Sequence, residues 1–242
     1  MRRTAWLLAL VLVWCGCRQR PDPLPDFPRL VLWAWERPER LTFIDPKSAG
    51  VAFLARTVSW RAGQITSRPR LQPLEVPPGT AMMAVVRLES GSSEGSPLPA
   101  TADLRVEIIK AASMASVQAL QIDFDAKLSE RDWYRRLLQE LRAAMKPGMP
   151  LGITALASWC DRESWLVGLP INDAVPMLFR MGAGEPDRTR DFRVEACRSS
   201  FGISTDEIPG DLPRGRRLFV FDPRPWDEDA YRGALRLAAK WR

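Results

Sequence analysis

The stretch ALQIDFDAKLSERDWYRRLLQELRAAMKPGMPLGITALAS, residues 119–158, decides the expected fold. Its opening part, residues 119–125, alternates apolar and polar side chains, which predicts a strand with one apolar face. Ser129 with Asp132 three residues later predicts a capping box, and the helix that follows ends at a Lys-Pro-Gly stop. Residues 151–158 predict the next strand. A strand, a helix and a second strand in this order are typical of a parallel βαβ unit.

Similar segments extend this alternation over the rest of the chain. We expect further strands at residues 30–35, 51–60, 80–88, 174–179, 201–204 and 217–222, an extended segment at 64–78, and helices at 104–117 and 227–241. With the two strands above, this pattern predicts an α/β fold of the (β/α)8 type, a TIM-like barrel. About 215 residues remain for it, fewer than the usual ~250, so we expect a trimmed barrel that lacks some helices. An open doubly wound sheet is the alternative, although no Gly-rich strand-to-helix turn marks its switch point.

Composition excludes several classes of function. The chain has 242 residues, of which 46% are hydrophobic, so it can bury one good core. It contains no His, which excludes Ser-His-Asp and Cys-His catalysis and every His-ligated metal site. The formal net charge is +6, but the arginines are scattered among carboxylates, so we expect no nucleic-acid partner. We also expect no metal and no cofactor.

The N-terminal segment predicts export. Residues 1–17 combine two arginines, an apolar run too short to span a bilayer, and a Gly16-Cys17 end that resembles the lipobox of bacterial lipoproteins. Trp14 stands where an aliphatic residue is usual, so a plain secretory signal is the alternative. We expect lipidation of Cys17, residues 18–28 as a Pro-rich tether, and 29–242 as a single barrel domain. In the sorting of Gram-negative lipoproteins, which this segment resembles, the absence of Asp directly after Cys17 favours an outer-membrane lipoprotein that faces the periplasm.

The expected export bears on the redox state of the two remaining cysteines, Cys160 and Cys197. Cys160 and Cys197 form an even pair in an oxidising compartment, which predicts a disulfide. The alternative is two unrelated buried thiols, because free Cys packs as a small hydrophobic residue.

The expected strand at residues 119–125 contains the strongest candidate for chemistry. Alternation places Gln121, Asp123 and Asp125 on one face, toward the interior of a barrel and near its carboxyl-terminal mouth. At i and i+2 the Cβ atoms of the two aspartates lie roughly 6.6 Å apart, close enough to raise the pKa of one of the carboxyl groups. A proton-holding acid beside an ionised partner suits glycoside cleavage. The alternative is that both aspartates pair with arginines such as Arg87 and have no chemical role.

Other strand ends contribute groups that suit a sugar site, because indole faces stack on sugar C–H groups while hydroxyls bond to charged side chains. We predict as substrate contacts Gln121, Trp33, Trp35, Glu36, Arg87, Trp159, Arg180, Asp222 and Trp226. For any single Trp the alternative is a place in the core. Asp206 and Glu207 form a possible metal-binding pair or, in the alternative that we favour, a solvated loop tip.

The segments LQIDFD (120–125), GITALASWC (152–160) and VLWAW (31–35) resemble the signatures of the bacterial domain-of-unknown-function family three-one-four-two. This resemblance implies an exported or lipid-anchored, glycosidase-like barrel without an established activity. The Gln-x-Asp-x-Asp register is also similar to the Asp-x-Asp-x-Glu strand of chitinase-type barrels, whose last position is the general acid. Here that position is Asp125, which is one methylene shorter.

Together these observations predict an exported, lipid-anchored barrel that binds carbohydrate and hydrolyses it, with Asp125 as the proton donor and Asp123 as its partner. The alternative is a catalytically silent envelope lipoprotein that binds a glycan or a protein partner. The oligomeric state is left open by the sequence.

Overall fold

A closed ring of parallel strands forms the centre of the computed structural model, which describes residues 21–61, 63–91, 97–180 and 191–241. Within these residues the ring has eight strands, which are in chain order β1 (Leu30–Ala34), β3 (Ala49–Arg61), β6 (Met82–Ser90), β7 (Val117–Asp123), β8 (Leu151–Leu156), β9 (Asp173–Met177), β10 (Ser200–Ser204) and β11 (Arg217–Phe221). Each strand pairs in parallel with the next, and β1 pairs with both β3 and β11, so the ring closes. The predicted (β/α)8 barrel is confirmed, and an open sheet is excluded.

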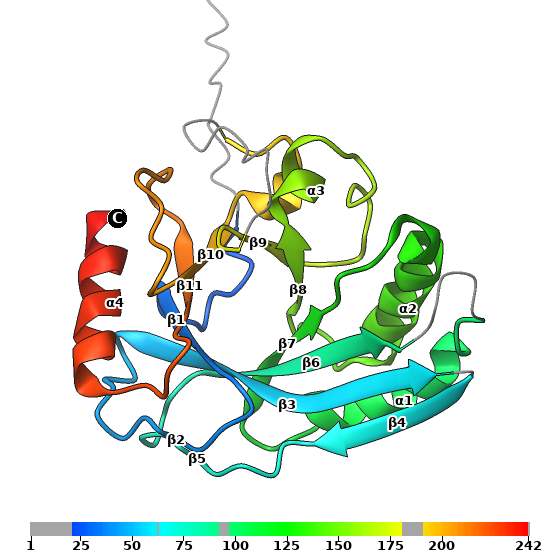
Figure 1. Ribbon diagram of the computed structural model, residues 1–242, viewed down its shortest axis with the longest axis horizontal. Helices are drawn as coiled ribbons and strands as arrows, with labels where there is room; N and C mark the ends of the chain where they lie inside the picture. Colours follow the sequence, from blue (N-terminus) through cyan, green and yellow to red (C-terminus); the bar gives the residue numbers. More distant parts are fainter. Residues whose placement is uncertain (1–20, 62, 92–96, 181–190, 242) are drawn as a thin grey trace, which may run out of the picture.

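The barrel is trimmed, as expected from its length. In the described part of the chain, the helices are α1 (Thr101–Ala112), α2 (Arg131–Ala144), α3 (Ala157–Asp161) and α4 (Glu228–Lys240), with short 3-10 helices at Leu128–Glu130 and Glu195–Cys197. The first two crossovers contain strands in place of helices: β2 (Glu39–Arg40) pairs with β5 (Leu74–Glu75), and β4 (Gln64–Pro69) is an antiparallel partner of β3. Figure 1 shows α1 and α2 beside β3, β6 and β7, and α4 on the side of β1 and β11. None of the described helices is long and apolar enough to cross a membrane.

Strand alternation separates two apolar layers. Side chains such as Leu120 and Ile122 face outward and form the larger core against the helices. A second cluster fills the barrel interior and includes Trp33, Val85 and Phe219. The interior is therefore a packed core below the carboxyl-terminal mouth, as in other β/α barrels.

The N-terminal residues 21–28 close the opposite end of the barrel. Leu24 is 1% exposed and Phe27 is also buried, and both belong to the interior cluster. The buried guanidinium group of Arg217 donates to the carbonyl oxygens of Leu24 and Phe27 and to the carboxylate of Asp22. The prediction of a tether over 18–28 is therefore wrong for residues 21–28, because their two apolar side chains and their carbonyl groups are bound by the barrel. We call residues 21–28 the N-terminal plug.

Two predicted boundaries also need correction. α1 ends at Ala112, and β7 begins at Val117 and ends at Asp123, so the strand lies two residues earlier than expected and Asp125 follows it. The expected capping box of Ser129 and Asp132 is absent: α2 follows a 3-10 turn in which the Glu130 carboxylate accepts a hydrogen bond from the backbone N–H of Lys127 at 2.8 Å.

Candidate functional site

The carboxyl-terminal end of β7 holds Asp123 in a fixed position. The residue is 5% exposed, and its carboxylate accepts two hydrogen bonds from the neighbouring strands. Arg87 on β6 donates from Nη1 to Oδ2 at 2.7 Å, and Thr154 on β8 donates from Oγ1 to Oδ1 at 2.7 Å. Arg87 therefore supplies the positive charge, and Arg87 and Thr154 the hydrogen bonds, that a buried carboxylate requires. The register explains this arrangement, because Arg87 lies directly opposite Asp123 on the neighbouring strand.

Asp125 has a different environment two residues later. Unlike Asp123, Asp125 is exposed to solvent. Protein atoms around its carboxyl group raise the pKa of Asp125, the charge of Asp123 raises it further, and Arg87 opposes both effects. The charge of Asp123 therefore acts on Asp125, although the two carboxyl groups have different environments. The expectation that one pKa of this pair is raised is met at Asp125, the residue predicted as the proton donor.

Aromatic rings and arginines surround this end of the barrel. The guanidinium group of Arg87 lies 5.8 Å from the centre of the Trp35 ring, and Trp35 meets Phe221 edge to face at 6.5 Å. Phe221 stacks on Phe179 with ring centres 6.0 Å apart, and the Arg180 guanidinium group lies 5.8 Å from the Phe221 ring. The structure thus brings together three of the predicted contacts, Trp35, Arg87 and Arg180. We call Trp35, Phe179 and Phe221 the mouth aromatics.

Phe179 and Phe221 were not among the predicted contacts, although alternation contained the signal. Phe221 is the last residue of β11 and has the same parity as the interior residue Phe219. Phe179 follows β9 with the same parity as the interior residue Val175. Continuing each interior face to the end of its strand finds both rings.

A second feature of the mouth is the backbone at Arg180. Its φ angle of 52° is in the left-handed region, which a residue with a side chain adopts only when other contacts hold it there. The backbone N–H of Arg180 donates to the Glu207 carboxylate at 2.7 Å, and this contact holds the turn. Glu207 therefore has a structural partner, which agrees with the loop interpretation of Asp206 and Glu207.

Three predicted contacts lie below or beside this region. Trp33 is buried in the barrel interior and donates from Nε1 to Oε1 of Gln121 at 2.9 Å. Nε2 of Gln121 has no hydrogen-bond partner among the described residues. Glu36 follows β1 and forms a salt bridge with Arg68 at 2.8 Å.

Three other predicted contacts are structural, and their prediction as sugar contacts is corrected here. Trp159, on α3, is 2% exposed and packs edge to face on Trp165 in the outer core. Trp226 is 4% exposed and donates from Nε1 to the carbonyl oxygen of Trp33. Asp222 is buried and accepts hydrogen bonds from Thr205 and from the backbone of Arg224. These side chains present almost no surface, so they are not placed to contact a sugar.

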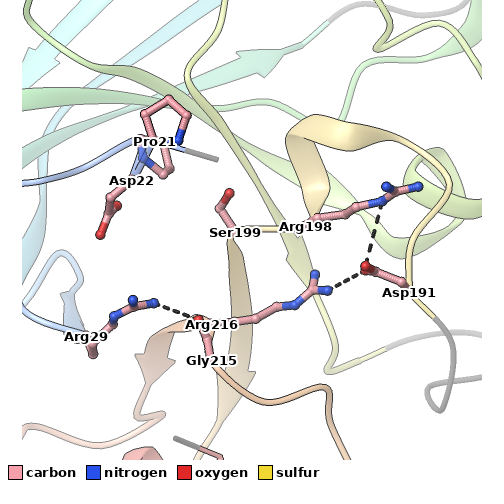
Figure 2. Close-up of a pocket in the computed structure, with 9 residues that line it drawn as sticks. Pro21, Asp22, Arg29, Asp191, Arg198, Ser199, Gly215 and Arg216 are labelled. Atoms are coloured by element: carbon pink, nitrogen blue, oxygen red, sulfur yellow. Dashed lines mark hydrogen bonds and ion pairs between the residues drawn. The ribbon is translucent and has the colours of Figure 1, made fainter. Parts of the chain in front are cut away.

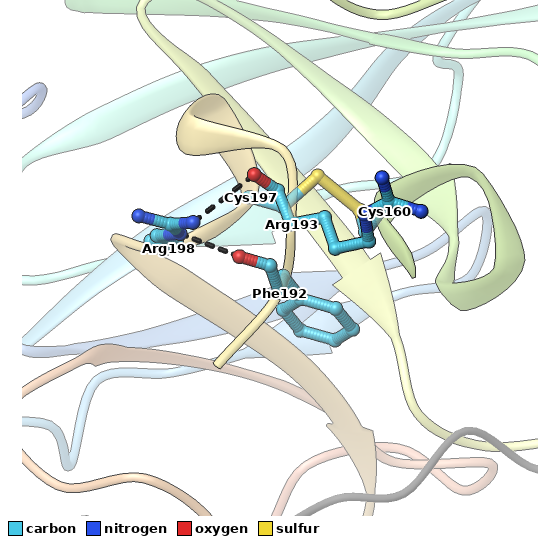
Figure 3. Close-up of a disulfide and its surroundings, with 5 residues drawn as sticks. All are labelled: Cys160, Phe192, Arg193, Cys197 and Arg198. Atoms are coloured by element: carbon cyan, nitrogen blue, oxygen red, sulfur yellow. Dashed lines mark hydrogen bonds between the residues drawn. A yellow bond between two sulfur atoms is a disulfide. The ribbon is translucent and has the colours of Figure 1, made fainter. Parts of the chain in front are cut away.

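The predicted disulfide is confirmed. Cys160 on α3 and Cys197 in the 3-10 helix before β10 are bonded, with Cα atoms 5.9 Å apart (Figure 3). The backbone N–H of Val194 also donates to the carbonyl oxygen of Cys160 at 3.0 Å. The bond joins the crossover after β8 to the segment before β10. Cys17 and the rest of the predicted signal, residues 1–17, lie outside the described residues, as do residues 18–20 of the predicted tether.

Fold and site together define a trimmed β/α barrel with an interacting carboxylate pair at its carboxyl-terminal mouth. No family model matches the chain, and no curated protein matches it. Among solved structures, it is similar to the chitinase domain of the spore coat protein CotE from Clostridium difficile, with 12% sequence identity and a TM-score of 0.44. The alignment covers 95% of this chain and 65% of the chitinase domain, so this chain spans less than two thirds of the length of that domain. The assignment of the fold rests on the strand pairing described above.

Proposed function

We propose that this protein is a glycosidase-like barrel that binds a carbohydrate at its carboxyl-terminal mouth and hydrolyses it. The observation that carries the proposal is the difference in environment between the neighbouring carboxyl groups of Asp123 and Asp125. Asp123 is held by Arg87 and Thr154, whereas the pKa of Asp125 is raised by its surroundings and by Asp123. Different environments that separate two carboxyl pKa values are the usual basis for assigning acid and partner.

The chemistry follows from this assignment. Protonated Asp125 donates its proton to the glycosidic oxygen while the bond from that oxygen to the anomeric carbon breaks. The charge of Asp123 favours the positive charge that develops on the sugar ring. Water supplies the hydroxyl group to the anomeric carbon, and its remaining proton restores Asp125. The net reaction is hydrolysis, with no other reactant.

The mouth aromatics supply the binding part of the proposal. Trp35, Phe179 and Phe221 are partly buried, so each presents some ring surface next to charged groups. Apolar ring faces beside hydrogen-bonding side chains match the alternating C–H and hydroxyl surfaces of a sugar. Arg180 and Arg87 border these rings and provide donors for hydroxyl or carboxylate oxygens.

A catalytically silent barrel that binds a glycan or a protein partner is the second candidate. One observation favours it: Arg87 and Thr154 satisfy the Asp123 carboxylate, so its burial has an explanation without chemistry.

Glycan-array binding followed by product analysis separates the two candidates. We expect the wild-type chain to bind and cleave a glycan, Asp125→Asn to bind it without cleavage, and the surface variant Asp132→Asn on α2 to behave as the wild type. Binding by all three proteins without any product would contradict the hydrolase proposal and favour the silent barrel.

We further propose that the protein is exported and anchored to the membrane through a lipid on Cys17, as a lipoprotein of the outer membrane that faces the periplasm. The support is the short apolar run and the Gly16-Cys17 end of the N-terminal segment. Mass spectrometry of the N-terminal peptide tests this: an acylated Cys17 as the first residue is expected. An unmodified Cys17, or cleavage at another position, would contradict it.

A further inference from the structure

A polar cavity of about 370 Å³ lies at the end of the barrel opposite to the mouth. Its wall includes residues that directly precede three neighbouring strands: Arg29 before β1, Arg198 and Ser199 before β10, and Arg216 before β11. Figure 2 shows Pro21 and Asp22 of the N-terminal plug on one side of this cavity and Arg198 and Asp191 on the other. The cavity is therefore built from segments that only the closed barrel brings together.

Positive charge exceeds negative charge around this cavity. The two carboxylates in the wall already have arginine partners: Asp22 binds Arg217 with both oxygens, at 2.9 and 3.1 Å, and Asp191 contacts Arg216. Asp191 also lies 3.9 Å from Nε of Arg198. Arg29 forms no ion pair with a carboxylate within the described ranges, although its charge also acts on Asp22, and it donates to the carbonyl oxygen of Gly215. The wall itself holds three guanidinium groups, from Arg29, Arg198 and Arg216, against the two carboxylates of Asp22 and Asp191, so one positive charge is in excess.

Hydrogen-bond donors remain available beside this charge. Arg29 uses Nη1 for Gly215, and Arg198 uses Nε and Nη2 for the carbonyl oxygens of Phe192 and Arg193, so each guanidinium group keeps further N–H groups. Ser199 adds a partly exposed hydroxyl group to the wall. Planar guanidinium groups with free N–H groups match the oxygens of a phosphate in geometry and charge.

We propose that this cavity binds a phosphate group. A phosphate ester or a free phosphate carries the negative charge that balances this excess, and it accepts several hydrogen bonds at once. The site is distinct from the mouth, so it does not depend on the proposed hydrolysis.

The position of the cavity suggests two sources for the phosphate. Pro21 lies at its edge, and four residues of chain from Cys17 can span at most about 14 Å. If Cys17 is acylated, the cavity lies within reach of the phosphates of lipid head groups. The second source is free phosphate or a soluble phosphate ester.

Titration calorimetry of the purified full chain with inorganic phosphate and with glycerol 3-phosphate tests binding of the free form. Sedimentation with vesicles tests the lipid form, using phosphatidylcholine vesicles that contain either phosphatidylglycerol or an equal mole fraction of oleate as the source of negative charge. We expect saturable binding in at least one arm and weaker binding, by about tenfold, in Arg29→Gln. Arg29 is the better position to change, because Arg198 also holds two backbone carbonyl groups.

The matched control is Arg236→Gln, which removes one exposed arginine from α4 on another part of the surface. Binding of inorganic phosphate that is lost in Arg29→Gln and kept in Arg236→Gln supports a site for free phosphate. The same pattern with phosphatidylglycerol vesicles alone assigns the phosphate to a lipid. The proposal fails if neither arm shows saturable binding, if both variants lose equal affinity, or if only the vesicles bind and oleate replaces phosphatidylglycerol without loss.

Discussion

Trp33 and Gly202 occupy the same layer of the barrel interior, where the indole ring of Trp33 fills the space that a side chain at position 202 would need. A Cβ atom at position 202 would lie 2.7 Å from Cη2 of Trp33 and 3.0 Å from its Cζ3. The indole ring cannot move easily, because it packs on Phe219 and its Nε1 is bonded to Gln121. The absence of a side chain on β10 therefore makes room for a ring that comes from β1.

We accordingly expect Gly202→Ala to destabilise the protein by about 1–3 kcal/mol, because overpacking forces the ring from its position. Urea unfolding measures the effect. The matched control is Gly152→Ala on β8, where the new Cβ would have its nearest neighbour at 3.5 Å and should change stability little. Equal destabilisation by both variants would show that the loss of glycine itself, and not the contact with Trp33, is responsible.

The pKa of Asp125 should respond to its two charged neighbours in opposite directions. Asp123→Asn removes a negative charge and should lower the pKa of Asp125, whereas Arg87→Gln removes a positive charge and should raise it. Carbon-13 NMR titration of the carboxyl groups measures both shifts. If Asp125 is the proton donor, hydrolysis is lost as pH rises through this pKa, so the alkaline limb moves to higher pH in Arg87→Gln. A pKa that stays the same in both variants would separate Asp125 from Asp123 and remove the basis of the acid assignment.

Asp173 gives the stability of the protein a pH dependence of its own. It is buried at the start of β9, where burial raises its pKa to about 6 against the opposing effects of the Ser200 hydroxyl and Arg217. Because the folded state holds this proton more tightly than the unfolded state, stability should increase as pH falls from above 6 toward 4.

Asp173→Asn should remove this dependence and raise the free energy of unfolding at pH 8, by roughly 1–3 kcal/mol. Ser200→Ala should act in the opposite direction at that pH, because the ionised carboxylate loses its donor at 2.6 Å. Urea unfolding at several pH values measures both. An unchanged slope in Asp173→Asn would mean that another group causes the dependence.

The disulfide should contribute substantially to stability, because it closes a loop between residues 37 positions apart. The chain-entropy estimate for such a loop is roughly 3–4 kcal/mol. We expect the double variant Cys160→Ser with Cys197→Ser to unfold at a correspondingly lower denaturant concentration. A reducing agent should destabilise the wild type to the same level and leave the variant unchanged. Insensitivity of the wild type to reduction would contradict this expectation.

The N-terminal plug should be part of the cooperative unit of folding. Leu24 is 1% exposed, and Leu24→Ala should cost about 2–5 kcal/mol, as for other large apolar side chains in a core. Pro25→Ala changes the neighbouring exposed residue and should have little effect. Thermal unfolding of both variants decides whether residues 21–28 are a plug or, as the sequence predicted, a loose tether.

The sequence predicted the barrel well because periodicity is local. Each strand is predicted from the apolar pattern of its own residues, and eight such segments joined by crossovers are sufficient to predict a (β/α)8 barrel. Even the error of two residues in β7 left the parity correct, so Gln121 and Asp123 still face the interior as expected. Ser113 ends α1 in a helical conformation, and neither a glycine nor a proline marks this boundary in the sequence.

The failures concern contacts that only the folded chain creates. The Pro-rich composition of residues 18–28 predicts an extended backbone, but nothing local shows that Leu24 and Phe27 enter the barrel. Trp159 was placed at a strand end, whereas the strand stops at Leu156 and a short helix turns the indole into the outer core. At that point the period changes from that of a strand to that of a helix, so parity no longer predicts the face.

The pairing of β1 with β11 also has a consequence for how the protein reaches its native state. Leu30 lies opposite Leu218, so the first strand of the barrel obtains its second neighbour only when the last strand is present. Contacts between such distant parts of a chain form slowly, since the intervening loop must close first. During synthesis the ring stays open at least until β11 has left the ribosome. The same delay would leave time for a chain that is translocated across a membrane to pass through unfolded.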